Sequence, residues 1–173
     1  MEFLNPEQVL NELELSDSMI AADFGSGSGG WAIPLAKKLK TGKVYAIDIQ
    51  DSALAGLKMK AEMAKLNNIK PIQADLEVGA GSSVQTGLLD LVLVTNLLFQ
   101  AKNKDQVFKE AARVLKTRGK LLVVDWRIEA KIGPETGRLT EQEVEDLAKN
   151  AGFSLDKKIK AGQYHYGLLF QEK

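Results

Sequence analysis

Residues Asp23 to Gly30 place one carboxylate directly before a run of glycines and serines, and they follow a short apolar segment. Glycine lets the backbone approach a ligand closely and adopt positive φ. A second acid, Asp48, ends the next apolar segment, where a pair of ribose hydroxyls would need an acceptor. This arrangement predicts a binding site for a nucleotide-like cofactor: a strand, a glycine loop, a helix and a second strand that ends in an acid.

Two classes of cofactor use this arrangement. Gly25, Gly27 and Gly30 satisfy the G-x-G-x-x-G spacing of NAD-binding domains, and Asp48 lies at a suitable distance from them. Asp23, however, lies two residues before the first glycine, where it would repel a pyrophosphate and attract a cationic amino-acid group. The sequence therefore favours a nucleoside that carries an amino acid, and it leaves an NAD(P)-binding oxidoreductase as an alternative.

Hydrophobic periodicity predicts alternating helices and strands, with no repeat and no low-complexity linker. The strands are expected at 19–24, 44–48, 69–74, 89–95, 120–126, 153–160 and 163–171. The helices are expected at 6–14, 31–40, 53–66, 104–116 and 141–150, with Asp51 or Ser52 capping the third and Thr140 the fifth. Five strand-helix steps closed by a hairpin predict an α/β fold with a doubly wound sheet.

The glycine-rich segment resembles motif I of the class I S-adenosylmethionine-dependent methyltransferases, an acid-x-G-x-G-x-G pattern at the end of the first strand. Residues 114–125 resemble the segment leading into the fifth strand, although Thr117-Arg118-Gly119 replaces the usual Pro-Gly-Gly. The resemblance extends from Pro6 to Phe170. It implies a single domain of residues 1–173 with a seven-stranded, mostly parallel sheet. The implied order is 3-2-1-4-5-7-6, with strand 7 antiparallel and helices on both faces.

The resemblance also implies S-adenosyl-L-methionine as the cofactor and S-adenosyl-L-homocysteine as its product. Asp23 would bind the ammonium, the glycines would pack under the methionine portion, and Asp48 would take the ribose hydroxyls. Asp75 and the Leu76 backbone would face the adenine, and Asn96 would lie near the methionine end or the substrate. The expected cofactor-binding residues are Asp23, Gly25, Ser26, Gly27, Gly29, Asp48, Ile49, Asp75, Leu76 and Asn96.

Methyl transfer from a sulfonium is an in-line displacement, so aligning the acceptor with the methyl supplies much of the rate. A general base is needed only where the acceptor arrives protonated. The candidates for a catalytic role are His165, Asn96 and Tyr164, and the sequence does not select among them. On an alternating last strand, Tyr164, Tyr166, Leu168 and Phe170 share one face, and His165, the single histidine, faces the other way.

The loop after the fifth strand, residues 127–139, is bracketed by Arg127 and Arg138, which either hold an anionic substrate group or are ordinary solvated arginines. Trp31 is expected to anchor its helix to the sheet. Trp126 ends a strand at the ligand edge, where it is expected to be buried beside the sheet or to line a substrate pocket.

Lysine and arginine balance aspartate and glutamate at 23 each, so nothing in the net charge favours a nucleic-acid or membrane partner. The chain has no cysteine and therefore no thiolate metal site, and no metal is expected. No apolar run approaches membrane-spanning length, so a cytoplasmic location is expected.

Residues around the fourth and fifth strands resemble the ubiquinone/menaquinone-biosynthesis branch of the family, which implies a small-molecule acceptor. The acceptor pocket is expected to be shallow and to be completed by loop 127–139, by a second subunit of a homo-oligomer or by a macromolecular substrate. An RNA or protein methyltransferase and a non-catalytic S-adenosylmethionine-binding module stay open as alternatives.

Overall fold

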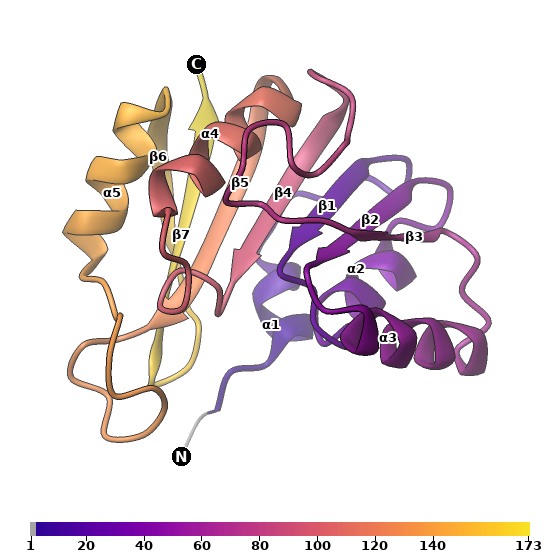
Figure 1. Ribbon diagram of the computed structural model, residues 1–173, viewed down its shortest axis with the longest axis horizontal. Coiled ribbons are helices and arrows are strands. Elements are labelled where there is room, and N and C mark those ends of the chain that lie inside the picture. The colour runs from indigo at the N-terminus through magenta and orange to yellow at the C-terminus, as the bar shows by residue number, and fades with distance from the viewer. Residues whose placement is uncertain (1–2) are drawn as a thin grey trace.

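The computed structural model describes residues 3–173 and contains one seven-stranded sheet (Figure 1). Its strands are β1 (Ile20–Phe24), β2 (Lys43–Asp48), β3 (Ile69–Gln73), β4 (Leu89–Thr95), β5 (Leu115–Trp126), β6 (Phe153–Ile159) and β7 (His165–Glu172). Their spatial order is β3-β2-β1-β4-β5-β7-β6, and β7 runs antiparallel to both β5 and β6. The other neighbouring strands pair in parallel. The fold class, strand order and direction of strand 7 expected from the sequence are confirmed.

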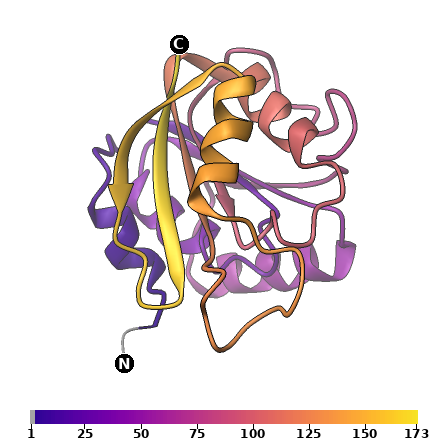
Figure 2. The same ribbon diagram turned by 90° about the vertical axis from the view of Figure 1, so that its left-hand side faces the viewer.

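Helices cover both faces of the sheet (Figure 2). The helices are α1 (Pro6–Asn11), α2 (Ala32–Lys38), α3 (Asp51–Met63), α4 (Lys104–Val114) and α5 (Glu141–Asn150). Buried side chains of α1, α2 and α3 join the hydrophobic cluster on one face, where Trp31 is buried as expected. Those of α4 and α5 join the cluster on the other face. The sheet is therefore the middle layer of three.

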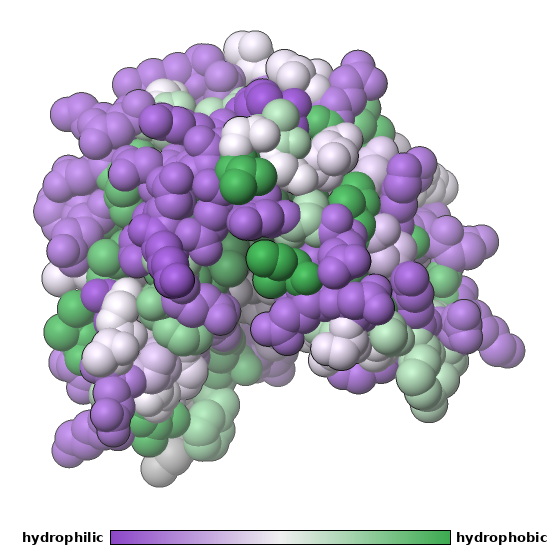
Figure 3. All heavy atoms as spheres, in the orientation of Figure 1, coloured by the Kyte–Doolittle hydropathy of each residue, from purple (hydrophilic) through white to green (hydrophobic). Residues whose placement is uncertain are grey.

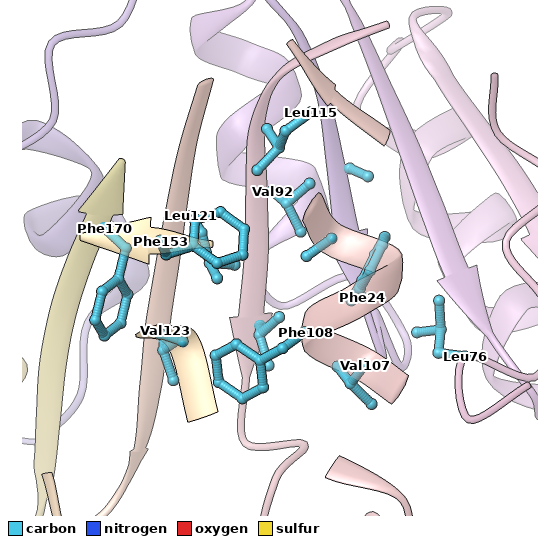
Figure 4. Close-up of a cluster of buried hydrophobic side chains, with 14 of the residues drawn as sticks. Phe24, Leu76, Val92, Val107, Phe108, Leu115, Leu121, Val123, Phe153 and Phe170 are labelled. Atoms are coloured by element: carbon cyan, nitrogen blue, oxygen red, sulfur yellow. The ribbon is translucent and has the colours of Figure 1, made fainter. Parts of the chain in front are cut away.

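The two central strands, β4 and β5, contribute side chains to both clusters, which explains why their sequences are nearly continuous apolar runs. Phe108 of α4 packs with Val92 and Val123 in the cluster that Figure 4 shows. A central sheet buried on both faces fixes the ends of its strands, and therefore the loops that follow them.

Local sequence signals explain several helix starts. The Asn5 side chain accepts hydrogen bonds from the first turn of α1, which has Pro6 at its first position. Thr140 and Glu143 form the predicted capping box of α5. The predicted cap of α3 is wrong, because α3 begins at Asp51 itself and its N-cap residue, Gln50, makes no capping side-chain bond.

The start of β5 also differs from the prediction. α4 ends at Val114 and β5 begins at the next residue, with no turn between them. The expected turn at residues 117–119 is instead an irregularity inside the strand, where the pairing with β4 shifts and Arg118 has φ 66°. Leucine and lysine residues on either side of this irregularity continue the strand. Thr-Arg-Gly in place of Pro-Gly-Gly thus goes with a bulge instead of a turn, and the buried part of β5 keeps its position.

The parallel strands β1, β2, β3, β4 and β5 all end at the same side of the sheet, the carboxyl edge, which faces downward in Figure 1. The space-filling view shows a hollow along this side of the molecule (Figure 3). Within residues 3–173, no helix has the length and apolar character needed to cross a membrane.

Candidate functional site

A cavity of about 250 Å³ lies at the carboxyl edge, between the loops that follow β1, β2, β3 and β4. Its lining residues are Gly25, Asp48, Ile49, Gln50, Ala74, Asp75, Leu76, Glu77, Leu97, Gln100, Ala101 and Val107. Five of the residues predicted to bind a cofactor are in this set. In an open α/β sheet a ligand binds at this edge, beside the point where the strand order reverses, here between β1 and β4.

A second, larger cavity of about 390 Å³ lies at the opposite edge, where β1, β4 and β5 begin. It contains none of the predicted site residues. Its charged rim is largely neutralised by ion pairs between Lys116 and Asp90 and between Lys120 and Asp156. The carboxyl-edge cavity is therefore the candidate site, because the glycine loop and the strand-ending acids meet there.

The glycine loop is fixed from β2. The N–H groups of Gly25 and Ser26 donate to the carbonyl of Ile47 at 2.8 and 2.9 Å, and Gly27 donates to Oδ2 of Asp48 at 2.8 Å. Oδ1 of Asp48 accepts the backbone N–H of Gln50 at 2.9 Å. Asp48 therefore connects the end of its own strand, β2, to the glycine loop that follows β1.

Two glycines of the loop have positive φ and differ in what a side chain at their position would meet. Gly25 has φ 73°, and a Cβ there would lie 3.0 Å from Cδ1 of Leu97. Gly27 has φ 52°, and a Cβ there would meet no protein atom within 4 Å. Positive φ is costly for any other residue type. The loop thus exposes its backbone to open space at its centre while packing closely on Leu97 at its start.

Asp23 is fully buried, and neither carboxylate oxygen has a hydrogen-bond partner among the described residues. Burial raises the pKa of Asp23 to about 7, opposed by the nearby N–H of Ala32 and reinforced by the charge of Asp48. The Oγ of buried Ser26 is also without a partner. Native structures seldom leave buried polar groups unpaired, so these atoms fit a site completed by a polar, cationic ligand group.

The loop after β3 forms the side of the cavity expected to face adenine. Oδ1 of Asp75 accepts the N–H of Glu77 at 2.8 Å, which closes a tight turn, and the Leu76 side chain is buried. Ile49, in contrast, is 60% exposed at the rim. Oε2 of Glu77 accepts the N–H groups of Lys102 and Asn103 at 2.8 and 2.6 Å, which ties this loop to the one after β4.

Asn96 lies directly after β4 with φ 49°, a left-handed conformation that is uncommon for residues other than glycine. Its Oδ1 is buried and has no hydrogen-bond partner within residues 3–173. Asn96 does not line the cavity, although its neighbours Leu97 and Gln100 do. The lining of the cavity at this turn comes from the residues that follow Asn96, so the role expected for Asn96 stays a prediction.

Asp125 is a residue of this region that the sequence analysis did not single out. It is 2% exposed, and its Oδ2 accepts the N–H of Leu98 at 2.9 Å. Burial raises the pKa of Asp125, while the N–H groups of Trp126, Leu98 and Phe99 lower it. The same signal that drew attention to Asp48, an acid ending an apolar strand at the carboxyl edge, could have found it.

His165 lies at the start of β7 and stacks on Trp126 of β5, with ring centroids 4.0 Å apart. It is 4% exposed, and neither ring nitrogen has a hydrogen-bond partner in the described chain. Burial, together with the charges of Arg127 and Arg138, lowers the pKa of His165 to about 4. The imidazole is therefore neutral at pH 7.

The faces predicted for the last strand hold for Tyr166, Leu168 and Phe170, which share one hydrophobic cluster. Tyr164 precedes β7 and is only half-buried; its ring lies 6.0 Å from that of Phe3. Neither His165 nor Tyr164 lines the carboxyl-edge cavity. Both lie further along the carboxyl edge, beside the end of β5.

Arg138 is half-buried, and its guanidinium is used within its own loop, a role that was not expected from the sequence. It donates to the backbone carbonyls of residues 127, 128, 130, 132 and 134, and so closes loop 127–139 on itself. Arg127 pairs with Glu141 at 3.1 Å. Half-buried Trp126 lies beneath the loop, with the Arg138 guanidinium 5.9 Å from its ring.

In the described part of the chain, no group of three or more histidine, aspartate or glutamate side chains has the spacing to hold a metal ion.

A family model described as a methyltransferase domain matches residues 15–170. The chain is 37% identical over 111 residues to the ubiquinone/menaquinone biosynthesis C-methyltransferase of Blochmanniella pennsylvanica, covering 63% of this chain and 42% of that protein. It is 37% identical over 78 residues to a 23S rRNA (uracil(1939)-C(5))-methyltransferase of Aliivibrio fischeri, covering 45% of this chain and 17% of that protein. The chain thus spans less than half the length of these curated relatives.

Among solved structures, an S-adenosylmethionine-dependent methyltransferase from Aquifex aeolicus is similar in fold. The TM-score is 0.89 at 25% sequence identity, and the superposition covers 99% of this chain and 91% of that one.

Proposed function

Because the chain belongs to the methyltransferase domain family, whose cofactor is S-adenosylmethionine, we propose that it transfers the methyl group of S-adenosyl-L-methionine to a small-molecule acceptor. We further propose that residues 1–173 act as one domain, of which residues 1–2 lie outside the described part of the structure. The cytoplasmic location and the homo-oligomeric state considered from the sequence stay predictions.

The observation that carries the proposal is the buried, unpaired carboxylate of Asp23 beneath the glycine loop. A positively charged ammonium would supply the missing partner and would favour the ionised form of Asp23. Gly25, Gly27 and Gly29 would hold the methionine portion, with Ser26 as a further polar contact. Asp48 would bind the ribose, because a carboxylate has acceptor sites left after two backbone bonds.

The opposite end of the cavity would hold the adenine. Ile49 at the rim and buried Leu76 offer an apolar surface to one ring, and Asp75 and the Leu76 backbone supply polar groups. Leu97 faces them from the loop after β4. The cofactor would therefore lie along the carboxyl edge, from Asp23 and the glycine loop to the end of β3.

S-Adenosylmethionine supplies a sulfonium methyl that is already activated, so the protein's part in catalysis is alignment. The end of β4 adjoins the glycine loop and the end of β5 lies next to it along the carboxyl edge, so both would position the acceptor. His165 is neutral and unpaired, so it has the protonation state of a base, but its burial against Trp126 keeps it from solvent. Asn96 and Tyr164 are the other candidates for contacts with the acceptor.

The surface around the end of β5 supports an acceptor without a negative charge. Arg138 is fully engaged by backbone carbonyls, and Arg127 is paired with Glu141. Ile128 and Ile132, in the loop after β5, are 51% and 42% exposed and would offer apolar surface to such an acceptor. The name of the Blochmanniella relative, a quinone biosynthesis C-methyltransferase, supports the same choice.

The RNA methyltransferase alternative has less support. The match to the rRNA methyltransferase covers 17% of that protein, and the net charge of this chain is zero. An NAD(P)-dependent oxidoreductase is disfavoured by the carboxylate of Asp23, which would face a pyrophosphate. A module that binds S-adenosylmethionine without catalysis would keep the same cavity, so only an activity measurement separates it from the enzyme.

Calorimetric titration with S-adenosylhomocysteine and, separately, with NAD tests the cofactor. We expect S-adenosylhomocysteine to bind and Asp48→Ala to weaken it at least about tenfold, as the loss of a charged hydrogen bond does. Asp51→Ala is the control, because Asp51 is an exposed neighbour. Tight binding of NAD instead would contradict the proposal. Methyl transfer from labelled S-adenosylmethionine to neutral aromatic compounds, with rRNA run in parallel, then tests the acceptor class.

A further inference from the structure

The turn after β4, residues 96–101, forms one wall of the cofactor cavity. It contributes Leu97, Gln100 and Ala101 to the lining. Leu97 packs directly on the glycine loop, since a Cβ on Gly25 would lie 3.0 Å from its Cδ1. A small movement of this turn would therefore change the width of the cavity beside the glycine loop.

The turn begins in a conformation that requires support. Asn96 has φ 49°, which a residue other than glycine keeps only where its surroundings hold it there. The Asn96 N–H donates to the carbonyl of Val124 at 2.9 Å, and the Gln100 side chain donates to the Asn96 carbonyl at 3.1 Å. These bonds fix the first residue of the turn, and a separate contact must hold the residues after it.

Asp125 makes that contact from the neighbouring strand. Its Oδ2 accepts the N–H of Leu98 at 2.9 Å, and its Oδ1 accepts the N–H of Trp126 at 2.8 Å. Each oxygen therefore has a backbone partner, and the side chain is 2% exposed. Asp125 is not among the residues that line the cavity. It is thus placed to hold the turn and has no access to the space that a ligand would fill.

We propose that Asp125 is a positioning residue, which sets the affinity for the cofactor by holding Leu97 against the glycine loop and Gln100 in the wall of the cavity. The inference rests on the proposed function, because it assigns a role toward the same cofactor. The proposed role differs from a purely structural role in one measurable respect. Removing the bond should weaken cofactor binding more than the loss of overall stability explains.

The test compares Asp125→Ala with Asp90→Ala. The first removes the acceptor of the Leu98 N–H, which asparagine would not do, because its amide oxygen can still accept that bond. Asp90 is a matched control, because its Oδ2 also accepts a backbone N–H, that of Ile20 at 2.8 Å, but at the opposite edge of the sheet. Calorimetry with S-adenosylhomocysteine should show affinity reduced about tenfold or more in Asp125→Ala and within about twofold of wild type in Asp90→Ala. Thermal unfolding should show a loss of stability in both.

A folded Asp125→Ala protein with wild-type affinity would overturn the inference. Where that variant does not fold, amide hydrogen exchange on the wild-type protein decides. The Leu98 amide should be protected, and protection across residues 97–101 should increase with S-adenosylhomocysteine; a Leu98 amide that exchanges as fast as exposed loop amides overturns the role. If wild-type protein does not bind S-adenosylhomocysteine at all, the proposed function fails instead.

Discussion

Asp48 accepts the backbone N–H of Gly27 at 2.8 Å, so the carboxylate expected to bind the ribose also fixes the loop expected to hold the methionine portion. Its second oxygen accepts the N–H of Gln50. One side chain thus connects two parts of the site before any ligand is present. The loss of Asp48 should consequently have two effects that can be measured separately.

The first effect is on the protein without ligand. Asp48→Ala leaves the N–H groups of Gly27 and Gln50 without their partner, and we expect the free energy of unfolding to fall by about 1–3 kcal/mol. Urea denaturation of the ligand-free protein measures it. Asp51→Ala, at the start of α3, should change the value by less than about 0.5 kcal/mol. Equal stability of Asp48→Ala and wild type would show that the loop does not depend on this carboxylate.

The centre of the glycine loop offers a cleaner separation of folding from binding. Gly27 and Gly152 both have positive φ, 52° and 98°, and a Cβ on either would meet no protein atom within 4 Å. Changing either to alanine should therefore cost a similar stability, about 1–2 kcal/mol, from backbone conformation alone. Only Gly27→Ala should also reduce S-adenosylhomocysteine affinity, because Gly152 lies in the loop after α5. Equal affinities of the two variants would argue against a cofactor at the glycine loop.

Sequence patterns predicted the strands well, because apolar runs mark strands that are buried on both faces. The order of the strands was implied by the resemblance to the methyltransferase family. β4 was predicted at its observed bounds, since Leu89–Thr95 is apolar except for Asp90 and the final threonine. The ends of α3 and α4 were predicted less well. Their limits depend on tertiary contacts, such as the pairing of Leu115 with Leu89, which makes Leu115 the first residue of β5 and so ends α4 at Val114.

The candidate site was predicted in part for the same physical reason. Asp48 and Asp75 could be placed because Asp48 ends β2, Asp75 lies two residues after β3, and the ends of parallel strands meet at one edge. Leu97 and Gln100 have ordinary side chains in a turn whose course depends on the bond from Asp125, 27 residues away from Leu98 in the sequence. The role of Arg138 was missed, because five carbonyls of one loop converge on it only in three dimensions.

The buried carboxylate of Asp23 predicts a pH dependence of stability. Its pKa is raised to about 7 in the folded protein, so this state binds a proton that the unfolded chain releases near pH 4. The contribution of Asp23 to stability should then fall by up to about 4 kcal/mol as pH rises from about 4 to about 7, and level off above that. Asp23→Asn should remove this dependence. Urea denaturation at several pH values measures it, and parallel curves for the two proteins would contradict it.

Binding of S-adenosylhomocysteine should show the opposite trend. Its ammonium pairs with the ionised form of Asp23, so affinity should increase about tenfold between pH 6 and pH 8. Calorimetry at the two pH values tests this, and Asp23→Asn should bind weakly with little pH dependence. An affinity for wild type that does not change with pH would show that Asp23 does not titrate on binding.

Arg138 should control the order of loop 127–139 without controlling the cofactor site. Arg138→Lys keeps the charge but loses the planar fork that reaches five carbonyls, so it should behave nearly as Arg138→Ala does. Limited proteolysis should cut residues 128–137 faster in both variants than in Lys131→Ala, an exposed control in the same loop. Affinity for S-adenosylhomocysteine should stay within about twofold of wild type, since no residue of this loop lines the cavity. If Arg138→Lys resists proteolysis as well as wild type does, the guanidinium does not hold the loop.

His165 should make the protein sensitive to acid. Burial and the charges of Arg127 and Arg138 hold its pKa near 4 in the folded state, whereas the unfolded chain takes up a proton near pH 6.5. Its contribution to stability is therefore present above about pH 6.5 and is lost as pH falls toward 4, by about 2 kcal/mol after allowance for solvent screening. His165→Phe keeps a ring against Trp126 and cannot gain a proton, so it should lose less stability than wild type between pH 6.5 and pH 4. If both proteins lose stability equally over that range, His165 is protonated in the folded state and its contact with Trp126 does not depend on a neutral ring.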